Sequence, residues 1–213
     1  MQKENRKYYE AYEDRYKTAH EKGVSWEQMK NTPIVMDIIN RYHLHPEQSL
    51  LEIGCGEGRD SATVLENGFH LMATDISPEA IDYCKKKMPD FESKFMVLDC
   101  LSSDLNEKFD FIYSIAVVHM FVLDEDRNGF YQFIRSHLKS DGIALICSMG
   151  DGNYEMLEPF QGFGRQTKIL HKTCGSVRNI NFSDMIWGRR ACTCEAGVDL
   201  EEIQRRIDPT KTR

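Results

Sequence analysis

Three glycines in five residues, placed directly after a short apolar run, limit the possible folds of this chain more than any other feature. Residues 50–59 read LLEIGCGEGR, with glycines at positions 54, 56 and 58. An apolar run that ends in glycines and leads into a helix-compatible stretch predicts a buried parallel strand, a tight turn and a helix start. Glycine permits positive φ in such a turn and lets a ligand approach the bare backbone. The segment therefore predicts an α/β fold, although by itself it could be the strand-to-helix turn of any such fold.

Carboxylates accompany the predicted strand ends. Glu52 lies in the first apolar run, and Asp75 and Asp99 follow the next two apolar runs. The separation of Gly54 and Asp75 matches the spacing of about 20 residues at which an acid meets a ribose in nucleotide-binding α/β folds. Because the carboxyl ends of parallel strands meet at one edge of a sheet, we expect these side chains to converge on one crevice. Carboxylates without a basic phosphate clamp favour a ligand with a ribose, an amine and a positive centre over a pyrophosphate.

The glycine pattern differs from the dinucleotide fingerprint Gly-x-Gly-x-x-Gly. Gly54 and Gly56 fit that fingerprint, but its sixth position holds Arg59, and the extra glycine is Gly58. The third glycine of the fingerprint allows close packing of the helix on the strand. Its absence counts against a nucleotide-dependent dehydrogenase, an alternative that NAD binding would reveal.

With these residues, the chain resembles the class I S-adenosylmethionine-dependent methyltransferases over about residues 46–150. Motif I of that family appears as LLEIGCGEG, the second-strand acid is Asp75 in LMATDIS, and the acid after the third strand is Asp99 in VLDC. The fourth strand is FDFIYSIAVVHMF at 109–121, and the family's LKPGG turn before the fifth strand reads LKSDG at 138–142. The resemblance implies a Rossmann-like, doubly wound α/β fold, with a mostly parallel sheet and helices on both of its faces.

The resemblance also implies a site for S-adenosyl-L-methionine, with S-adenosyl-L-homocysteine as the product. The glycines would touch the methionine part through their backbone, Asp75 would hold the ribose hydroxyls, and Asp99 would hold the adenine amino group. His119, after the fourth strand, is the candidate catalytic base, because an imidazole can take up a proton near neutral pH. Packing beside Phe121 explains this histidine equally well. The predicted cofactor-binding residues are Glu52, Gly54, Cys55, Gly56, Gly58, Asp75, Ile76, Asp99, Cys100, Ser114 and Ile115.

The methyl acceptor stays open. The compact core, and the fourth strand followed by an acidic helix, are similar to tellurite-resistance and thiopurine-type methyltransferases. That similarity implies a small-molecule acceptor with a soft nucleophile, such as a thiol or a chalcogen oxyanion. The fourth strand has no Asn-Pro-Pro-Tyr motif, which argues against amino methylation of adenine or glutamine. The alternatives are a catalytically silent module that binds S-adenosylmethionine and acts through a partner, and a protein or RNA methyltransferase.

A stripe of tyrosines marks the N-terminal segment. Tyr9, Tyr12 and Tyr16 recur at i, i+3 and i+7 in a charged segment at 3–30 that is expected to be helical, so they share one helix face. This face could pack permanently on the sheet, or cover the cofactor, whose sulfonium is attracted to aromatic faces. Arg59 joins the tyrosines as a predicted substrate-side residue. The expected division is an N-terminal helical lid at 1–45, a cofactor-binding core at 46–150 and a C-terminal substrate-side segment at 151–213.

The C-terminal third has a less regular pattern. A glycine- and aromatic-bearing loop at 150–165 is expected to close over the cofactor together with the tyrosines. Strand-like pieces follow at 166–171, 176–182 and 185–193, and then a final helix at 199–207. Members of the family end the sheet with two strands, the last of them antiparallel. This region is therefore either shortened or supplies those strands in an altered layout.

Composition favours a small soluble enzyme with one domain. The chain has 213 residues and a net charge of −7, which disfavours a nucleic-acid partner on electrostatic grounds. It has no apolar run near the ~18 residues that cross a membrane, and its N-terminus lacks the apolar core of a signal peptide. We therefore expect a cytoplasmic monomer or homodimer without a membrane partner.

The seven cysteines are expected to be thiols, as in a reducing cytosol. Cys174, Cys192 and Cys194 match no common zinc spacing, so no metal site is expected. Four further cysteines lie in apolar strand or helix contexts, where buried thiols are common. These predicted buried thiols are Cys55, Cys84, Cys100 and Cys147.

Overall fold

The computed structural model describes residues 8–25, 31–149, 168–174 and 186–188, and for Tyr8, residues 148–149 and the last two segments it gives the backbone only. Strands and helices alternate along the chain, as they do in parallel sheets. With η for a 3-10 helix, the elements are η1 Tyr8–Glu10, α1 Ala11–Glu21, α2 Pro33–Arg41, β1 Ser49–Ile53, α3 Arg59–Glu66, β2 His70–Asp75, α4 Pro78–Lys87, η2 Pro89–Lys94, β3 Phe95–Val97, β4 Phe109–Ile115, η3 Val118–Met120, α5 Asp124–His137, β5 Leu138–Met149, β6 Lys168–Cys174 and β7 Ile186–Gly188.

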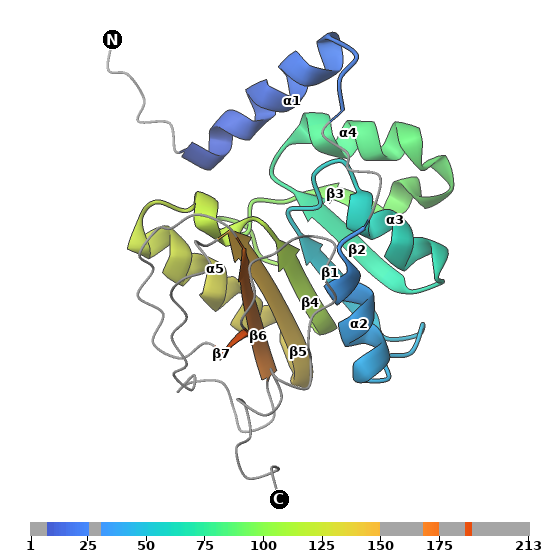
Figure 1. The fold of residues 1–213 in the computed structure, drawn as a ribbon, viewed down its shortest axis with the longest axis vertical. Coiled ribbons are helices and arrows are strands. Elements are labelled where there is room, and N and C mark those ends of the chain that lie inside the picture. Colours follow the sequence, from blue (N-terminus) through green and yellow to red (C-terminus); the bar gives the residue numbers. More distant parts are fainter. Residues whose placement is uncertain (1–7, 26–30, 150–167, 175–185, 189–213) are drawn as a thin grey trace, which may run out of the picture.

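The strands form a seven-stranded sheet in the order β3-β2-β1-β4-β5-β6-β7, and every neighbouring pair runs parallel. Helices cover both faces of this sheet (Figure 1). The predicted Rossmann-like, doubly wound α/β fold is therefore confirmed. The strand order reverses between β1 and β4, and sheets of this type bind ligands at the carboxyl ends of the strands beside such a reversal.

Two hydrophobic cores, one on each face, hold the helices on the sheet. Consecutive residues of a strand point to opposite faces, so Leu50 and Leu51 of β1 are both fully buried but belong to different cores. Phe111 and Ile112 of β4 divide in the same way. Side chains of α2, α3 and α4 complete one core, and side chains of α5 complete the other.

The start of α4 follows the signals in its sequence. The Ser77 hydroxyl caps the helix by accepting the N–H of Ala80 at 3.1 Å, and Pro78 occupies the first helical turn. Capping fixes the chain directly after the end of β2. The acidic end of that strand is thereby held at the edge of the sheet where the crevice is expected.

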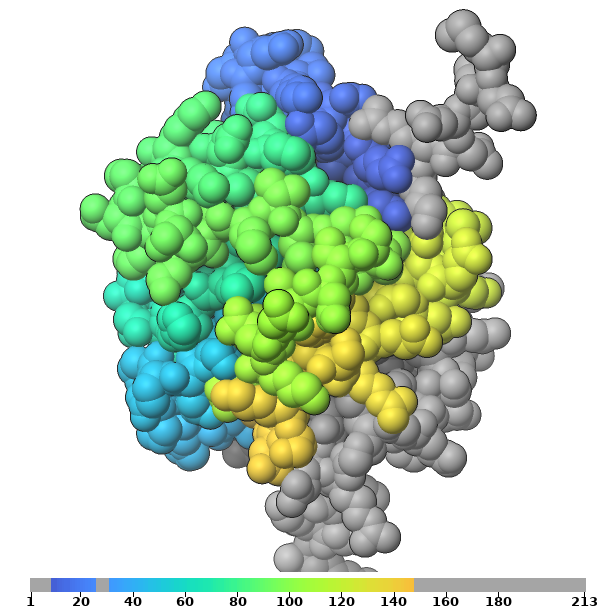
Figure 2. Space-filling model, turned by 180° about the vertical axis from the view of Figure 1, so that it is seen from behind, coloured from blue at the N-terminus to red at the C-terminus, as the bar shows by residue number. Residues whose placement is uncertain are grey.

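The N-terminal helix α1 is shorter than the charged segment that was predicted to be helical. It ends at Glu21, where the N–H groups of Lys22 and Gly23 donate to the carbonyls of Ala19 and His20. Glycine is common just after a helix end. In Figure 1, α1 lies above the sheet, on the side toward which the strand arrows point, and Figure 2 shows it in blue along the top of the surface, beside the green residues of α4. It therefore lies at the same edge of the sheet as the strand ends.

The fifth strand begins earlier than expected. Leu138 follows α5 directly and already pairs with Phe109 of β4, and a register shift then carries the pairing on to Phe111 and Ile143. The LKSDG segment at 138–142 therefore lies inside a strand with an irregular register instead of forming a turn before it.

The last two strands have an altered layout. β6 overlaps the strand predicted at 166–171, whereas β7 falls within the piece at 185–193. Both strands run parallel to their neighbours, so the antiparallel last strand of the family pattern is not found among the described strands. The loop predicted at 150–165, the strand predicted at 176–182 and the helix predicted at 199–207 lie outside the described residues.

Candidate functional site

A crevice of about 360 Å³ opens at the carboxyl ends of the central strands, below α1. It lies at the point where the strand order reverses between β1 and β4, as expected for an open α/β sheet. The predicted site residues come together here, with two exceptions, Gly58 and Ser114. Those that line the crevice are Tyr9, Tyr12, Tyr16, Glu52, Gly54, Cys55, Gly56, Arg59, Asp75, Ile76, Asp99, Cys100, Ile115 and His119.

The two exceptions contact neighbouring elements of the fold and do not line the crevice. Ser114 is buried, and its hydroxyl donates to the carbonyl of Ile53 at 2.8 Å, which ties β4 to β1. Gly58 precedes α3, and a Cβ at this position would lie 2.6 Å from Cε of Met88 and 3.0 Å from Sγ of Cys84. Gly58 therefore allows α3 to start close against the end of α4.

Asp75, at the end of β2, holds the glycine loop in place. Its two carboxylate oxygens accept the N–H of Gly56 and the N–H of Ser77, each at 2.9 Å. Burial raises the pKa of Asp75, although these N–H donors act in the opposite direction. Each carboxylate oxygen can accept a further hydrogen bond, so Asp75 can still take hydroxyl donors from a ligand in the crevice.

The N–H groups of Gly54, Cys55, Gly56 and Gly58 are used within the protein. Gly54 and Cys55 both donate to the carbonyl of Thr74, at 2.7 and 2.9 Å, and Gly58 donates to the carbonyl of Cys55 at 3.0 Å. A Cβ at Gly54 would lie 2.2 Å from Cγ2 of Val117, in the turn after β4. These four N–H groups are therefore not available to a ligand, and Gly54 allows the close approach of the neighbouring turn.

Glu52 places a buried carboxyl at the floor of the crevice. The side chain accepts the hydroxyl of Ser61 at 2.5 Å and the hydroxyl of Tyr113 at 3.0 Å. Burial and the charge of the neighbouring Asp60 raise the pKa of Glu52 to about 8. Glu52 therefore holds a proton near neutral pH, and a cationic ligand group beside it would favour its ionised form.

Arg59 supplies the one guanidinium or ammonium group among the described residues that line the crevice. Its Nη2 donates to Oγ1 of Thr32 at 2.6 Å and to Oδ2 of Asp60 at 2.9 Å. The hydroxyl of Thr32 donates in turn to Asp60 at 2.9 Å, and its N–H donates to the same carboxylate. The Nε of Arg59 is buried and has no hydrogen-bond partner within the described part of the chain, so it can donate to an anionic ligand group.

Asp99 lies just after β3 and lines the crevice on the β3 side of the sheet. Its carboxylate accepts the N–H of Leu101 at 2.9 Å and the hydroxyl of Ser102 at 2.7 Å, which orders the turn that carries it. Burial, and next the charge of Asp99, raises the pKa of the Cys100 thiol to about 12. Cys100 therefore lines the crevice as a neutral thiol.

The segment after β4 forms the wall on the other side. Ala116 has a φ of +62°, a region that non-glycine residues rarely adopt, and it turns the chain from β4 toward η3. His119 lies in η3 and lines the crevice, two residues before Phe121. No pattern in the sequence indicates a left-handed alanine, so sequence reasoning missed Ala116.

The three tyrosines reach both walls of the crevice, Tyr9 from η1 and Tyr12 and Tyr16 from α1. The ring of Tyr9 packs edge-on against Phe121 at 5.3 Å, and the hydroxyl of Tyr12 donates to Sδ of Met120 at 3.6 Å. The Tyr16 hydroxyl lies over the glycine loop, 2.9 Å from where a Cβ of Gly56 would be. The predicted shared face of these tyrosines therefore covers the crevice in the structure.

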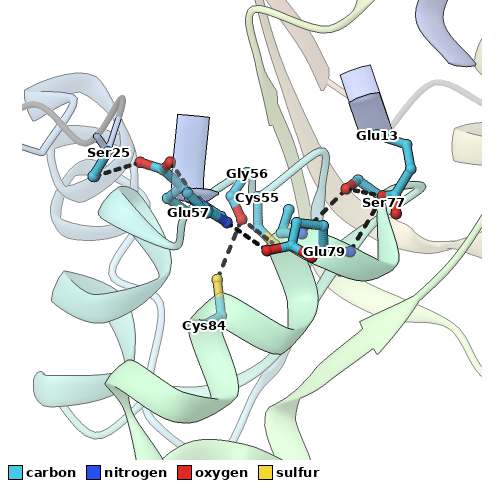
Figure 3. Close-up of polar contacts among 10 residues, drawn as sticks. Glu13, Ser25, Cys55, Gly56, Glu57, Ser77, Glu79 and Cys84 are labelled. Carbon is cyan, nitrogen blue, oxygen red and sulfur yellow. Dashed lines mark hydrogen bonds and ion pairs between the residues drawn. The ribbon is translucent and has the colours of Figure 1, made fainter. Parts of the chain in front are cut away.

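Sequence reasoning also missed two polar residues on the same face of α1, Glu13 and His20. Glu13 approaches Ser77 at the start of α4 (Figure 3). His20 contacts Glu57 of the glycine loop and Glu79 of α4. Their positions continue the spacing of the tyrosine stripe. That spacing was the signal that could have indicated them.

Several further features are established only for the described residues. Cys55, Cys84, Cys100 and Cys147 are buried free thiols, as predicted. No cluster of three or more His, Cys, Asp or Glu suited to a metal ion occurs within residues 8–25, 31–149, 168–174 and 186–188. No helix in those segments has the length and apolarity needed to cross a membrane.

Comparisons with known proteins agree with this geometry. Residues 51–144 match the family model of a methyltransferase domain. A malonyl-[acyl-carrier protein] O-methyltransferase of Acetivibrio thermocellus is 27% identical over 181 residues, which are 83% of this chain and 60% of that protein. A second one, of Anoxybacillus flavithermus, is 34% identical over 76 residues, or 34% of this chain and 29% of that protein.

A similar solved structure is that of the glycopeptide N-methyltransferase MtfA complexed with sinefungin. It has a TM-score of 0.51 and 21% identity, over 63% of this chain and 57% of that chain, and shows a shared fold. The strand order and the helices on both faces of the sheet fit the Rossmann-like fold of class I methyltransferases. The family match covers residues 51–144, less than half of the chain, so this region is similar to S-adenosylmethionine-dependent methyltransferases. The chain spans about 60% of the length of the first of these relatives.

Proposed function

We propose that this protein binds S-adenosylmethionine and transfers its methyl group to a small-molecule acceptor. The observation that carries the proposal is the convergence of Glu52, Asp75 and Asp99 on one crevice beneath a face of tyrosines. Carboxyl groups suit an amine, two ribose hydroxyls and an adenine amino group. The crevice volume of about 360 Å³ also lies within the range of about 300–1,000 Å³ that is usual for small-ligand pockets.

Each crevice residue has a role that follows from its surroundings. Asp75 would accept hydrogen bonds from the ribose hydroxyls, and Asp99 would accept one from the adenine amino group. Glu52 lies deepest and would face the ligand's ammonium group, which favours its ionised form. The buried Nε of Arg59 would donate to the ligand's carboxylate.

When bound, S-adenosylmethionine supplies a methyl group that its sulfonium already activates. The protein's own contribution is then to orient the acceptor in line with that methyl group and to exclude water. Tyr9, Tyr12 and Tyr16 close the crevice and present aromatic faces, which attract a sulfonium. His119 can take the acceptor's proton when the reacting group must lose one.

Two classes of acceptor are distinguished by their reacting atom. The resemblance to thiopurine-type enzymes favours a soft nucleophile such as a thiol. The names of the two malonyl-[acyl-carrier protein] O-methyltransferases favour an alternative, an acceptor bound to a carrier protein and methylated on oxygen.

Binding and turnover test the proposal separately. Calorimetry on the full chain is expected to show S-adenosylhomocysteine binding at micromolar affinity, about −8 kcal/mol, and no binding of NAD. An acceptor screen coupled to release of S-adenosylhomocysteine then identifies the substrate. Tight NAD binding without S-adenosylhomocysteine binding would overturn the proposal. Binding without turnover on any acceptor would instead favour the silent module.

A further inference from the structure

Two polar residues of α1 lie on the helix face that carries Tyr12 and Tyr16, which cover the crevice together with Tyr9. Glu13 and His20 lie three residues before and four residues after Tyr16, so the three side chains share one helix face. Both contact elements that carry the crevice instead of pointing into solvent. Their contacts are described one at a time below.

His20 bridges two carboxylates from different elements. Its Nδ1 lies 2.7 Å from Oε1 of Glu79 in α4, and its Nε2 lies 3.0 Å from Oε1 of Glu57 in the glycine loop. The imidazole is 14% exposed and the Glu57 side chain only 3%, so water screens the Glu57 contact little. The ring also stacks on Tyr83 at 4.6 Å. Because an ionised carboxylate only accepts hydrogen bonds, both ring nitrogens must donate, and only the imidazolium can do so.

Glu13 holds the same helix about two turns earlier. Its Oε2 accepts the hydroxyl of Ser77 at 2.5 Å and the N–H of Glu79 at 3.2 Å, at the start of α4. Figure 3 shows Glu13 reaching Ser77 at the start of α4. Ser25, beyond the end of α1, donates to Oε2 of Glu57 at 2.7 Å. The helix is thus attached to the crevice at both ends of its inner face.

We propose that His20 is a positioning residue, a protonation-dependent clamp that holds α1, and with it the tyrosine cover, against the glycine loop and α4. While the imidazole is charged, it satisfies Glu57 and Glu79 together. When it loses its proton, one ring nitrogen becomes an acceptor and faces a carboxylate oxygen at hydrogen-bond distance. That repulsion loosens α1 where Tyr16 lies over Gly56.

The charges around His20 set the direction of this dependence. Partial burial lowers the pKa of His20, but the hydrogen bonds and charges of Glu79 and Glu57 outweigh it and raise the pKa overall. The other groups that face the imidazole are the phenol rings of Tyr83 on α4 and Tyr16 on α1. Because the folded protein binds this proton more tightly than the unfolded chain, the clamp is complete below the raised pKa of His20, as long as Glu57 and Glu79 are ionised. It is lost as the pH rises through the raised pKa of His20.

Hydrogen exchange of α1 tests the clamp without any ligand. Protection of the amides at 11–21, corrected for intrinsic exchange, is expected to fall about three- to tenfold between pH 6 and pH 9, while protection of β4 stays constant. His20→Gln removes the titrating group, so its protection is expected to be low at every pH. His20→Lys keeps a cation throughout and is expected to retain protection at pH 9. His70→Gln, at an exposed histidine of β2, is the matched control and is expected to behave as the wild type.

The outcomes separate this inference from the proposed function. An unchanged pH dependence in His20→Gln would overturn the clamp, and so would a loss of protection at pH 9 in His20→Lys equal to that of the wild type. A fall in S-adenosylhomocysteine affinity between pH 6 and pH 9, parallel to the fall in protection, is the one expectation that rests on the proposed function. Exchange results as expected, with no S-adenosylhomocysteine binding at any pH, would support the clamp and refute the proposed function alone.

Discussion

The contact between Gly56 and Tyr16 allows a quantitative test of whether α1 covers the crevice. Gly56 has a φ of +55°, and a Cβ at this position would lie 2.9 Å from the Tyr16 hydroxyl but 3.9 Å from the next ring atom, Cζ. Gly56→Ala therefore meets two separate obstacles. The left-handed backbone costs about 1–2 kcal/mol, and the crowded hydroxyl adds about 1–3 kcal/mol.

Removing the hydroxyl separates these two effects. In Gly56→Ala/Tyr16→Phe the nearest ring atom would be at ordinary contact distance, so only the backbone strain would remain. Urea unfolding is expected to show a loss of about 2–5 kcal/mol for Gly56→Ala, and recovery of about 1–3 kcal/mol in the double variant after the effect of Tyr16→Phe alone is subtracted. S-adenosylhomocysteine affinity, measured by calorimetry, is expected to follow the same pattern.

Gly68 provides a matched control for the backbone effect. It also has a positive φ, +81°, but nothing lies within 4 Å of the position of its Cβ. Gly68→Ala is therefore expected to lose about 1–2 kcal/mol, with no dependence on Tyr16 and no effect on affinity. A coupling energy of zero between Gly56→Ala and Tyr16→Phe would refute the docked position of α1 over the glycine loop.

Three further predictions concern the walls of the crevice. Asp75→Ala is expected to weaken S-adenosylhomocysteine binding by about 1.5–3 kcal/mol in calorimetry, and Asp99→Ala by a similar or smaller amount, because each carboxylate is proposed to accept ligand hydrogen bonds; unchanged affinity in Asp75→Ala would contradict its ribose role. The pKa of Glu52 is raised to about 8 in the folded state. In urea unfolding, the wild type is therefore expected to lose stability relative to Glu52→Gln as the pH rises from about 5 to 8. A constant difference in stability between the two proteins would mean that Glu52 is ionised throughout this range. Ala116→Gly relieves a φ of +62° and is expected to raise the free energy of unfolding by about 0.5–1 kcal/mol, and a loss of stability would contradict backbone strain at this position.

The crevice could be predicted from the sequence where its chemistry coincides with a strand end. Asp75 and Asp99 follow apolar runs, and parallel strands bring their carboxyl ends to one edge, so local patterns were sufficient to place both acids together. Glu52 was harder, because only the structure shows that Ser61 and Tyr113 surround its carboxyl. The sequence indicates that a carboxyl group lies at this strand end, but the protonation of Glu52 depends on neighbours that are distant along the chain.

The directions in which residues point, and unusual backbone conformations, could not be predicted in the same way. Gly58 belongs to the glycine motif but faces α4, because the direction of a bare Cα depends on the turn that carries it. Ser114 ends a strand beside the crevice, yet its side chain points to Ile53. Ala116 adopts a conformation that its residue type does not favour, so only the surrounding contacts can impose it.

The helix α1 explains why the N-terminal stripe was recognised but only partly understood. Tyr16 and Ala19 of α1 are buried, yet neither belongs to the two cores that hold the other helices on the sheet. Instead, Tyr16, Glu13 and His20 hold α1 on the glycine loop, which lines the crevice, and on the start of α4. A ligand in the crevice would contact the same loop, so docking of α1 and ligand binding must influence each other by equal free energies. The helical spacing that aligns the tyrosines also aligns the two polar anchors, and the stripe is best understood as one surface with aromatic and charged parts.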